Sequence, residues 1–289
     1  MSFKGIILAG GSGTRLSPLT IHMSKQLLPV FDKPLIYYPL YTLMSANIRD
    51  VLIITAPQEI NNFKKLLGNG ERFGIKISYK VQKKPNGIAE AFIIGKKFIK
   101  KDPICLILGD NIFFGIDLIN SLPLNKKDFQ GAKIFAFKVP NPSRYGVVKL
   151  NKKNQPVSIE EKPKKPKSNL AVTGLYIYDN DIVNIASKIK PSKRNELEIT
   201  DINDYYLKNK KLDVEILRTG SVWLDAGTTT SLLQASQFVQ TIQERQNLLI
   251  SSPEELAFAK KWITKKTLNK FFSKNNNNEY AKYIKNLFS

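Results

Sequence analysis

The chain has 289 residues, 42% of them hydrophobic, and a formal net charge of +21. This length and apolar content suffice for one large domain or two small ones with a sizeable buried core. A membrane-spanning helix is excluded, because no apolar run approaches the roughly 18 residues that it needs. Met1 to Leu8 lacks the layout of a signal peptide, and the single cysteine, Cys105, excludes an intramolecular disulfide. We therefore expect a cytoplasmic protein with no membrane partner.

The positive charge is compatible with polyanionic partners, so polynucleotide binding stays open as an alternative. The lysines nevertheless fall in scattered pairs, such as Lys64–Lys65 and Lys210–Lys211, and form no single basic arm. No familiar nucleic-acid motif accompanies them. We expect no specific nucleic acid partner, and attribute the charge to a solvated surface and a site for small anions.

Strands and helices alternate in the first part of the chain. Apolar runs predict strands at 3–8, 50–55, 75–81 and 104–108, and helical spacing predicts helices at 35–46 and 87–99. This alternation indicates an α/β fold with a Rossmann-like, mostly parallel twisted sheet flanked by helices. Ligands bind beyond the carboxyl ends of such strands. Gly10, Thr55, Gln82 and Asp110 each follow a strand, and we expect them to face one crevice.

The alternation of strands and helices changes after Lys133. Short strands are expected at 134–139, 146–150, 158–160 and 173–178, with a lysine- and proline-rich loop at 162–168. From Thr230 the pattern is largely helical, and a polar tract at 275–278 is interpreted as a loop. We predict a core of residues 1–228, divided into halves of about 1–132 and 133–228, and a helical C-terminal segment, 229–289.

A glycine-rich turn, GGSGTRLSPLT, follows the first strand. Gly10, Gly11 and Gly13 permit backbone torsions closed to other residues and the close approach of a phosphate to backbone N–H groups. Arg15 can bind phosphate oxygens through two hydrogen bonds. The turn is not the dinucleotide fingerprint, whose third glycine would fall at Arg15, and not a Walker A loop, which needs Gly-Lys-Ser/Thr. Lys25 follows in SKQLLPV, whose apolar run argues against a free surface position.

Two aspartates end apolar runs, Asp110 in LGDN and Asp225 in VWLD. Mg²⁺ commonly takes one or two carboxylates together with substrate phosphates, so both are candidate ligands. Only the fold can bring two such distant residues together, and their spacing does not show that it does. For Asp225, a helix-capping role ahead of Thr228 stays open.

The glycine turn followed by KQLLPVFDKPLIYYPL resembles the sugar-1-phosphate nucleotidyltransferase family. The likeness continues in order through QKKPNGIAEAFIIG, LILGDNIFFG, NPSRYGVV, EEKP, VTGLYIYD, NELEITDIN and VWLDAGT. The most similar branch couples dTTP to glucose 1-phosphate, giving dTDP-glucose and pyrophosphate at the start of dTDP-L-rhamnose biosynthesis. The resemblance implies that residues 1–132 bind the nucleotide and that a smaller β part, 133–228, binds the sugar.

The resemblance also assigns roles to individual residues. It implies catalytic roles for Arg15, Lys25 and Lys162, and Mg²⁺ ligation by Asp110 and Asp225. Nucleotide binding is implied for Gly10, Gly11, Gly13, Thr14, Arg15, Gln82, Gly87 and Asp110. Sugar-phosphate binding is implied for Lys25, Asn111, Tyr145, Gly146, Glu161, Lys162, Val172, Tyr176, Arg194 and Trp223. The amide of Gln82 can donate and accept, which suits the edge of thymine or uracil.

Other functions stay open at this point. The same chemistry with UTP or another sugar 1-phosphate is the nearest alternative, because one methyl group is worth only about 1–3 kcal/mol in a fitted pocket. A non-catalytic regulatory protein is more distant. The joint presence of Arg15, Lys25, Asp110, Lys162 and Asp225 argues against it.

For the C-terminal segment the resemblance implies contacts in a homotetramer and a second nucleotide site, where dTDP-rhamnose would inhibit. Ala259 stands where relatives commonly carry an arginine, and Ser252 where many carry a cysteine. Loss of an arginine removes a bidentate hydrogen-bonded contact with phosphate, so we predict weakened or altered feedback inhibition. Asn195 replaces a usual glycine. Asparagine tolerates a left-handed conformation, so we expect that turn to survive.

Overall fold

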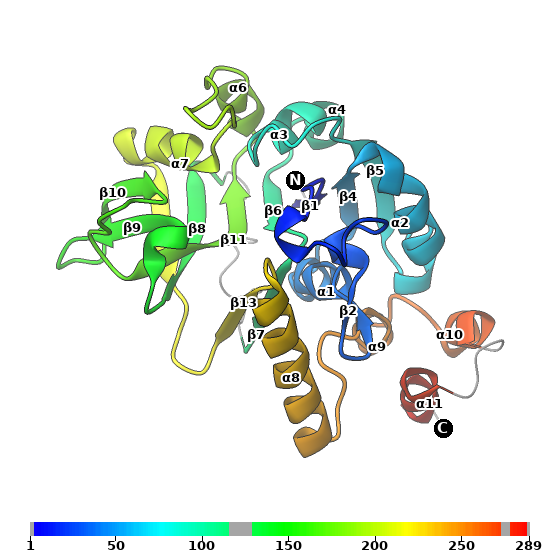
Figure 1. Ribbon diagram of the computed structural model, residues 1–289. Coiled ribbons are helices and arrows are strands. Elements are labelled where there is room, and N and C mark those ends of the chain that lie inside the picture. The colour runs from blue at the N-terminus through cyan, green and yellow to red at the C-terminus, as the bar shows by residue number, and fades with distance from the viewer. Residues whose placement is uncertain (1–2, 116–128, 273–277, 288–289) are drawn as a thin grey trace.

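The computed structural model describes residues 3–115, 129–272 and 278–287. Nine strands form the central sheet in the order β10-β9-β11-β6-β1-β4-β5, with β8 between β11 and β12 (Figure 1). The strands are β1 (Lys4–Ala9), β4 (Asp50–Thr55), β5 (Lys76–Val81), β6 (Ile104–Leu108), β8 (Ala132–Lys138), β9 (Gly146–Leu150), β10 (Pro156–Glu161), β11 (Leu170–Tyr178) and β12 (Leu212–Ile216).

The first half of the sheet is parallel. Strand β1 pairs in parallel with β4 and β6, and β4 pairs in parallel with β5. The second half is joined through β11, which runs antiparallel to both β6 and β8. Residues 51–55 of β4 are all buried, as expected of a parallel strand covered on both faces. The predicted α/β fold is therefore confirmed, and its parallel part lies where strands and helices alternate in the sequence.

Helices cover both faces of the sheet (Figure 1). One core joins the sheet to α3 (Glu90–Ile94), α4 (Lys96–Ile99), α6 (Ile182–Ala186) and α7 (Ile199–Lys208). The core on the other face includes α1 (Tyr37–Ser45), α2 (Ile60–Leu67), α9 (Pro253–Ala259), α10 (Lys265–Phe272) and α11 (Glu279–Asn286). The Cys105 thiol is buried in this second core, and burial raises its pKa to about 12.

A separate two-stranded ribbon connects distant parts of the chain. Strands β7 (Asn111–Phe114) and β13 (Val222–Asp225) pair antiparallel, with Asp225 opposite Asn111. Helix α8 (Thr229–Gln246) then packs against this ribbon and the hairpin of β2 (Pro29–Val30) and β3 (Lys33–Pro34). Thr228 caps α8, accepting a hydrogen bond from the Ser231 N–H. The capping role left open for Asp225 is thus filled by Thr228.

The C-terminal segment is helical, as predicted, but it is not detached from the core. Helix α9 packs against α1. The boundary expected after residue 228 stays a prediction. Of the polar tract at 275–278, residues 275–277 lie outside the described residues, and Asn278 caps α11 through the Ala281 N–H. Within the described ranges, no helix has both the length and the apolar character needed to cross a bilayer.

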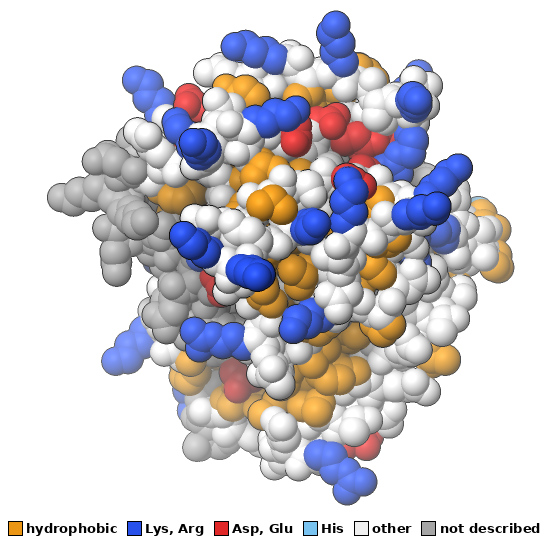
Figure 2. Space-filling view, turned by 90° about the vertical axis from the view of Figure 1, so that its left-hand side faces the viewer, with side chains coloured by type: hydrophobic (Ala, Val, Ile, Leu, Met, Phe, Trp, Pro, Cys, Tyr) orange, Lys and Arg blue, Asp and Glu red, His pale blue; other side chains and the backbone are white. Residues whose placement is uncertain are grey.

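Figure 2 shows one face of the molecule. On this face the Lys and Arg side chains are spread over the surface among uncharged and hydrophobic groups, with Asp and Glu side chains between them in the upper part of the view. This distribution agrees with the scattered lysine pairs in the sequence. It differs from the continuous basic stripe that is typical of polynucleotide binding.

Candidate active site

A cavity of about 210 Å³ opens between the parallel half of the sheet and the second half. Its lining includes many of the residues singled out from the sequence: Arg15, Asp110, Asn111, Tyr145, Gly146, Glu161, Lys162, Val172, Tyr176, Trp223 and Asp225. Ile88, Leu108, Arg144, Gly174, Ile199 and Thr200 complete it. Residues from both predicted halves therefore share one cavity, as a two-substrate site requires.

The glycine turn needs its glycines for different reasons. Only Gly13 has the left-handed conformation, with a φ of +64°, and it precedes a short 3-10 turn at Thr14–Leu16. At Gly10 an added Cβ would lie 2.4 Å from Oε1 of Gln82, so this glycine allows a close side-chain approach. Gly11 is open, with nothing within 4 Å of an added Cβ. Of the three glycines, Gly13 is therefore the one that uses the torsional freedom a glycine permits, and the expected approach of a phosphate to the turn stays a prediction.

The two aspartates meet through the β7–β13 ribbon, and their charges interact. Burial opposes the charge on Asp110, but the ion pair with Lys25 and hydrogen bonds from Lys25 and Asn111 outweigh it and lower the pKa. Burial and the Asp110 charge raise the pKa of Asp225 to about 6, against the opposing effects of Lys25, Arg15 and Arg144.

This acidic pair suits a divalent cation. Two buried carboxylates that repel one another would gain from a shared positive charge. Among the described residues no cluster of three or more His, Cys, Asp or Glu side chains is placed to hold a metal. Two carboxylates are too few for an all-protein cage but match Mg²⁺, which keeps waters and substrate phosphates as further ligands.

Arg15 lies beside Asp225. A Cβ added to Gly227 would be 2.9 Å from Oδ1 of Asp225 and 3.0 Å from Nη2 of Arg15. The absence of a side chain at Gly227 thus leaves room for both groups. Arg15 is exposed, and its charge is directed into the cavity beside the acidic pair.

Asn111 ties the ribbon to the sheet. Its Oδ1 accepts hydrogen bonds from the Gly174 N–H at 3.0 Å and from Nε1 of Trp223 at 2.6 Å. Its Nδ2 donates to Oδ1 of Asp110 at 2.9 Å. The Trp223 ring also packs edge-on against Tyr145. Three hydrogen-bonding positions of Asn111 are thus used by Asp110, Gly174 and Trp223, and its expected contact with the sugar phosphate stays a prediction.

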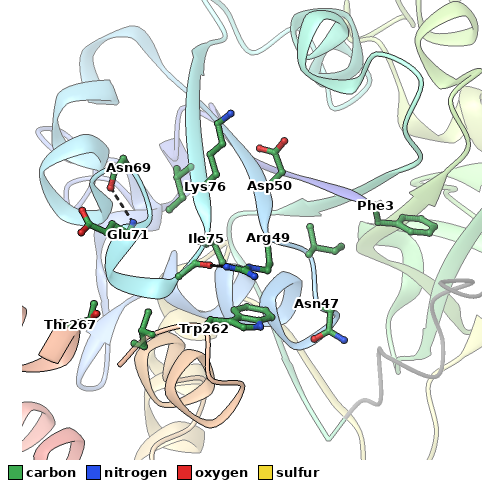
Figure 3. A pocket seen from close by; sticks show the side chains of 14 residues that line it. Phe3, Asn47, Arg49, Asp50, Asn69, Glu71, Ile75, Lys76, Trp262 and Thr267 are labelled. Atoms are coloured by element: carbon green, nitrogen blue, oxygen red, sulfur yellow. Dashed lines mark hydrogen bonds between the residues drawn. The ribbon is translucent and has the colours of Figure 1, made fainter. Parts of the chain in front are cut away.

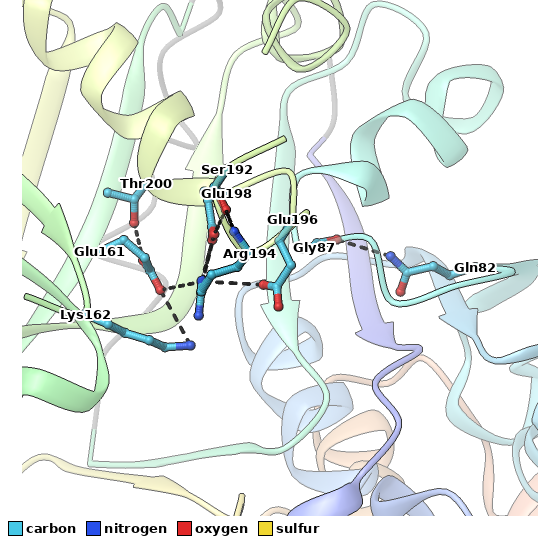
Figure 4. A network of polar contacts seen from close by, with 9 residues as sticks. All are labelled: Gln82, Gly87, Glu161, Lys162, Ser192, Arg194, Glu196, Glu198 and Thr200. Carbon is cyan, nitrogen blue, oxygen red and sulfur yellow. Dashed lines mark hydrogen bonds and ion pairs between the residues drawn. The ribbon is translucent and has the colours of Figure 1, made fainter. Parts of the chain in front are cut away.

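A polar network lies around Glu161 (Figure 4). Thr200 donates to its Oε2 at 2.5 Å, and Arg194 and Lys162 approach its Oε1 at 3.4 and 3.8 Å. Arg194 also pairs with Glu198 at 2.8 Å. Arg194 does not itself line the cavity but lies behind Glu161.

Two residues in the segments that carry this network have left-handed backbones. Asn195 has a φ of +57°, so the prediction that asparagine preserves the usual glycine turn is confirmed. Lys162 has a φ of +42°. Such a conformation is uncommon for a lysine and is found more often at functional sites.

Gln82 and Gly87 form a second cluster at the end of β5. The Gln82 Nε2 donates to the Gly87 carbonyl at 3.2 Å (Figure 4). Gly87 has a φ of +106°, and an added Cβ would lie 2.4 Å from the Leu197 carbonyl oxygen. The glycine is thus required by the Leu197 backbone, a reason that the sequence did not supply. Thr55 was predicted to face the crevice, but its side chain is fully buried and does not. Its backbone carbonyl accepts a hydrogen bond from the Gln82 N–H.

Two other hollows lie away from this cavity. One, of about 1070 Å³, lies where β4 and β5 begin, and Figure 3 shows Arg49 above the Trp262 ring there. None of the predicted site residues lines it. Another, of about 440 Å³, lies between α1, β7 and α9 and is lined in part by Tyr41, Glu255 and Ala259.

The sequence profile of the nucleotidyl transferase family matches residues 4–242. The chain belongs to this family. It is 54% identical to the glucose-1-phosphate thymidylyltransferase of Neisseria meningitidis serogroup A / serotype 4A, covering 97% of this chain and 98% of that protein. It is also 54% identical to the Mycobacterium tuberculosis enzyme of the same name, with 90% of each chain covered.

Solved structures of similar proteins support the same family. A putative glucose-1-phosphate thymidylyltransferase from Bacillus anthracis, in complex with a sucrose, superposes with a TM-score of 0.77 at 42% identity, covering 82% of this chain and 95% of that one. A UDP-glucose pyrophosphorylase complexed with UDP-glucose gives a TM-score of 0.73 at 28% identity, covering 83% and 99%.

Several residues in or beside the cavity were not singled out from the sequence. Arg144, Thr200 and Gly227 all contact or influence predicted residues. Each lies inside a motif that carried the resemblance, in NPSRYGVV, NELEITDIN and VWLDAGT. The motifs therefore held the signal, but only the fold shows which neighbour each residue serves.

Proposed function

We propose that this chain transfers the dTMP group from dTTP to α-D-glucose 1-phosphate, giving dTDP-glucose and pyrophosphate. The observation that carries the proposal is the shared cavity, which Arg15, Asp110 and Asp225 line together with Glu161 and Lys162, while Lys25 pairs with Asp110. The names of the relatives support the choice of dTTP and glucose 1-phosphate.

In the proposed reaction a phosphate oxygen of the sugar attacks the α-phosphorus in line. A new P–O bond forms, the bond from the α-phosphorus to the bridging oxygen breaks, and pyrophosphate leaves with the electron pair. The nucleophile is already an anion and needs no general base. The difficulty is to bring two anions together, so positioning and charge neutralisation are expected to dominate catalysis.

Different residues would carry out the positioning and the charge neutralisation. Arg15 and the open backbone at Gly11 would hold the leaving pyrophosphate. Lys25 and Lys162 would stabilise charge on the α-phosphate and on the attacking phosphate. Glu161, fixed by Thr200, would accept hydrogen bonds from sugar hydroxyls, and Arg194 would approach the sugar phosphate.

Asp110 and Asp225 would hold Mg²⁺, with Asn111 fixing the orientation of the first carboxylate. The ion would supply Lewis-acid neutralisation of the donor phosphates. Before it binds, Lys25 partly balances the charge of the acidic pair.

For the C-terminal helices we propose contacts in a homotetramer. The hollow at Ala259 would be the site where dTDP-rhamnose acts. The reaction product would then enter dTDP-L-rhamnose synthesis in the cytoplasm.

A pyrophosphate-release assay with a panel of nucleoside triphosphates and sugar 1-phosphates tests the proposal. We expect the highest kcat/KM for dTTP with glucose 1-phosphate. UTP is the second candidate, favoured by the structural likeness to a UDP-glucose pyrophosphorylase. No release with any pair of substrates would overturn the proposal, and preference for UTP would reassign the nucleotide.

A further inference from the structure

The amide of Gln82 is held in one orientation. The side chain is only 3% exposed, and its Nε2 donates to the Gly87 carbonyl at 3.2 Å and to Oε2 of Glu90 at 2.8 Å. Both hydrogens of the NH₂ group are therefore used. Figure 4 shows the nitrogen turned toward Gly87 and the oxygen turned away from it.

Glu90 makes this orientation the only favourable one. A carboxylate accepts hydrogen bonds and donates none, so a flipped amide would place Oε1 of Gln82 against two acceptors, Glu90 and the Gly87 carbonyl. Glu90 is itself held, because Nδ2 of Asn86 donates to its other oxygen at 2.9 Å. Asn86 is anchored in turn by the Leu197 N–H, which donates to its carbonyl at 2.7 Å.

The Gln82 oxygen is what remains for a ligand. No described residue donates to this Oε1, which lies over Gly10 at the foot of the glycine turn. The oxygen of Gln82 is thus an acceptor without a donor, and it lies beside the glycine turn that is expected to bind the nucleotide. Thymine and uracil carry a hydrogen on ring nitrogen N3 and match an acceptor. The N3 atom of cytosine is itself an acceptor and would meet Oε1 with repulsion.

We propose that Glu90 is a positioning residue that sets the base specificity of this enzyme. By orienting the Gln82 amide it selects bases with a hydrogen on the ring nitrogen over cytosine, which has the same pyrimidine ring. The inference rests on the proposed function to the extent that Gln82 contacts the base.

The test is Glu90→Gln, which keeps the shape but can donate as well as accept, so that the Gln82 amide is free to turn. We expect the ratio of kcat/KM for dTTP over dCTP to fall about tenfold or more, the effect of one misplaced hydrogen-bonding group. The KM for glucose 1-phosphate should not change. Glu90→Ala, which removes both hydrogen bonds, should lower the ratio in the same direction.

Glu244→Gln is the matched control, because it makes the same chemical change on an exposed position of α8 and should leave the ratio unchanged. A purely structural role for Glu90 would lower activity with both nucleotides equally. An unchanged ratio in both Glu90 variants would overturn the inference.

Equilibrium binding of dTTP and dCTP, measured by calorimetry, separates this inference from the proposed reaction. Wild-type protein that binds dTTP more tightly than dCTP, with the difference reduced in Glu90→Gln, supports the inference even if no substrate pair turns over. Equal binding of the two nucleotides by the wild type overturns it even if dTTP is turned over.

Discussion

Individual side chains in the cavity act through charge, and Lys162 shows this most directly. Its side chain is 48% exposed, and its backbone is left-handed. An exposed lysine held in an uncommon conformation contributes little to packing, so we infer that its contribution lies in binding and turnover.

Lys162→Ala should lower kcat by about 100-fold or more, the usual effect of removing one group that stabilises transition-state charge. The melting temperature should change little, because the side chain is largely exposed. Lys164→Ala, an exposed lysine of the same loop, should retain activity. Near-normal turnover of Lys162→Ala would contradict its assigned role.

Asp225 should make the ligand-free protein less stable as the pH rises. Its pKa is about 6 in the folded protein against 3.8 for an unperturbed aspartate, so the folded state holds the proton more tightly. Its contribution is fully present below about pH 4 and is lost as the pH rises through about 6, by up to roughly 3 kcal/mol.

Asp225→Asn is neutral throughout and avoids this loss. Without metal, the variant should be more stable than the wild type at pH 7.5, and the gain should shrink toward pH 5. Urea denaturation at both pH values measures it. A variant no more stable than the wild type at pH 7.5 would show that Asp225 is not strained by burial and by Asp110.

At the scale of elements, a buried ion pair fastens the C-terminal helices to the core. Glu254 of α9 is fully buried and accepts from Nε of Arg72 at 2.7 Å and from the Tyr280 hydroxyl of α11 at 2.6 Å. Arg72 also contacts Tyr37 of α1. Glu254 and Arg72 together thus connect α9, α11 and α1 with the turn at 71–73.

Arg72→Met should lower the free energy of unfolding by about 3–5 kcal/mol, because it leaves a buried carboxylate without its cation. Replacing the carboxylate as well, in Arg72→Met/Glu254→Met, should recover much of the loss. Lys208→Met, which breaks an exposed pair with Asp204, should cost less than about 1 kcal/mol. A loss of that small size in Arg72→Met would show that the buried pair does not fasten the helices.

At the scale of the whole molecule, the hollow of about 440 Å³ lies against a ribbon that also reaches the active site. The hollow touches β7, the strand that follows Asp110 directly and pairs with the Asp225 strand. A ligand there would contact the same ribbon that holds the acidic pair. This continuity would give the proposed feedback inhibition a physical route, although the short side chain of Ala259 offers the ligand no charge.

We expect dTDP-rhamnose to inhibit the wild type weakly, and Ala259→Arg to tighten inhibition about tenfold, as one added charge-assisted hydrogen bond would. The inhibitor concentration at half-maximal rate, at fixed substrate concentrations, measures the effect. Ala259→Met adds length without charge and serves as the control. Inhibition that is unchanged in Ala259→Arg would contradict the assignment of the hollow.

The sequence by itself determined the features that are local. Alternating apolar runs predicted the parallel strands and their helices, because hydrophobic periodicity reports which face of each element is buried. The glycine turn, Arg15 and Lys25 were found because they lie close together in one segment. The left-handed turn at Asn195 followed from the preference of one residue type.

Only the tertiary structure decided which distant residues meet. Asp110 and Asp225 converge because β7 pairs with β13, and the register between strands so far apart is not written in either segment. In the sequence nothing distinguishes Glu90 from other glutamates in helices. Its hydrogen bond with Gln82 forms because α3 begins beside the end of β5. Strand pairing and packing depend on the whole chain at once. The sequence therefore indicated which residues carry the chemistry of the site, but not how those residues are arranged in space.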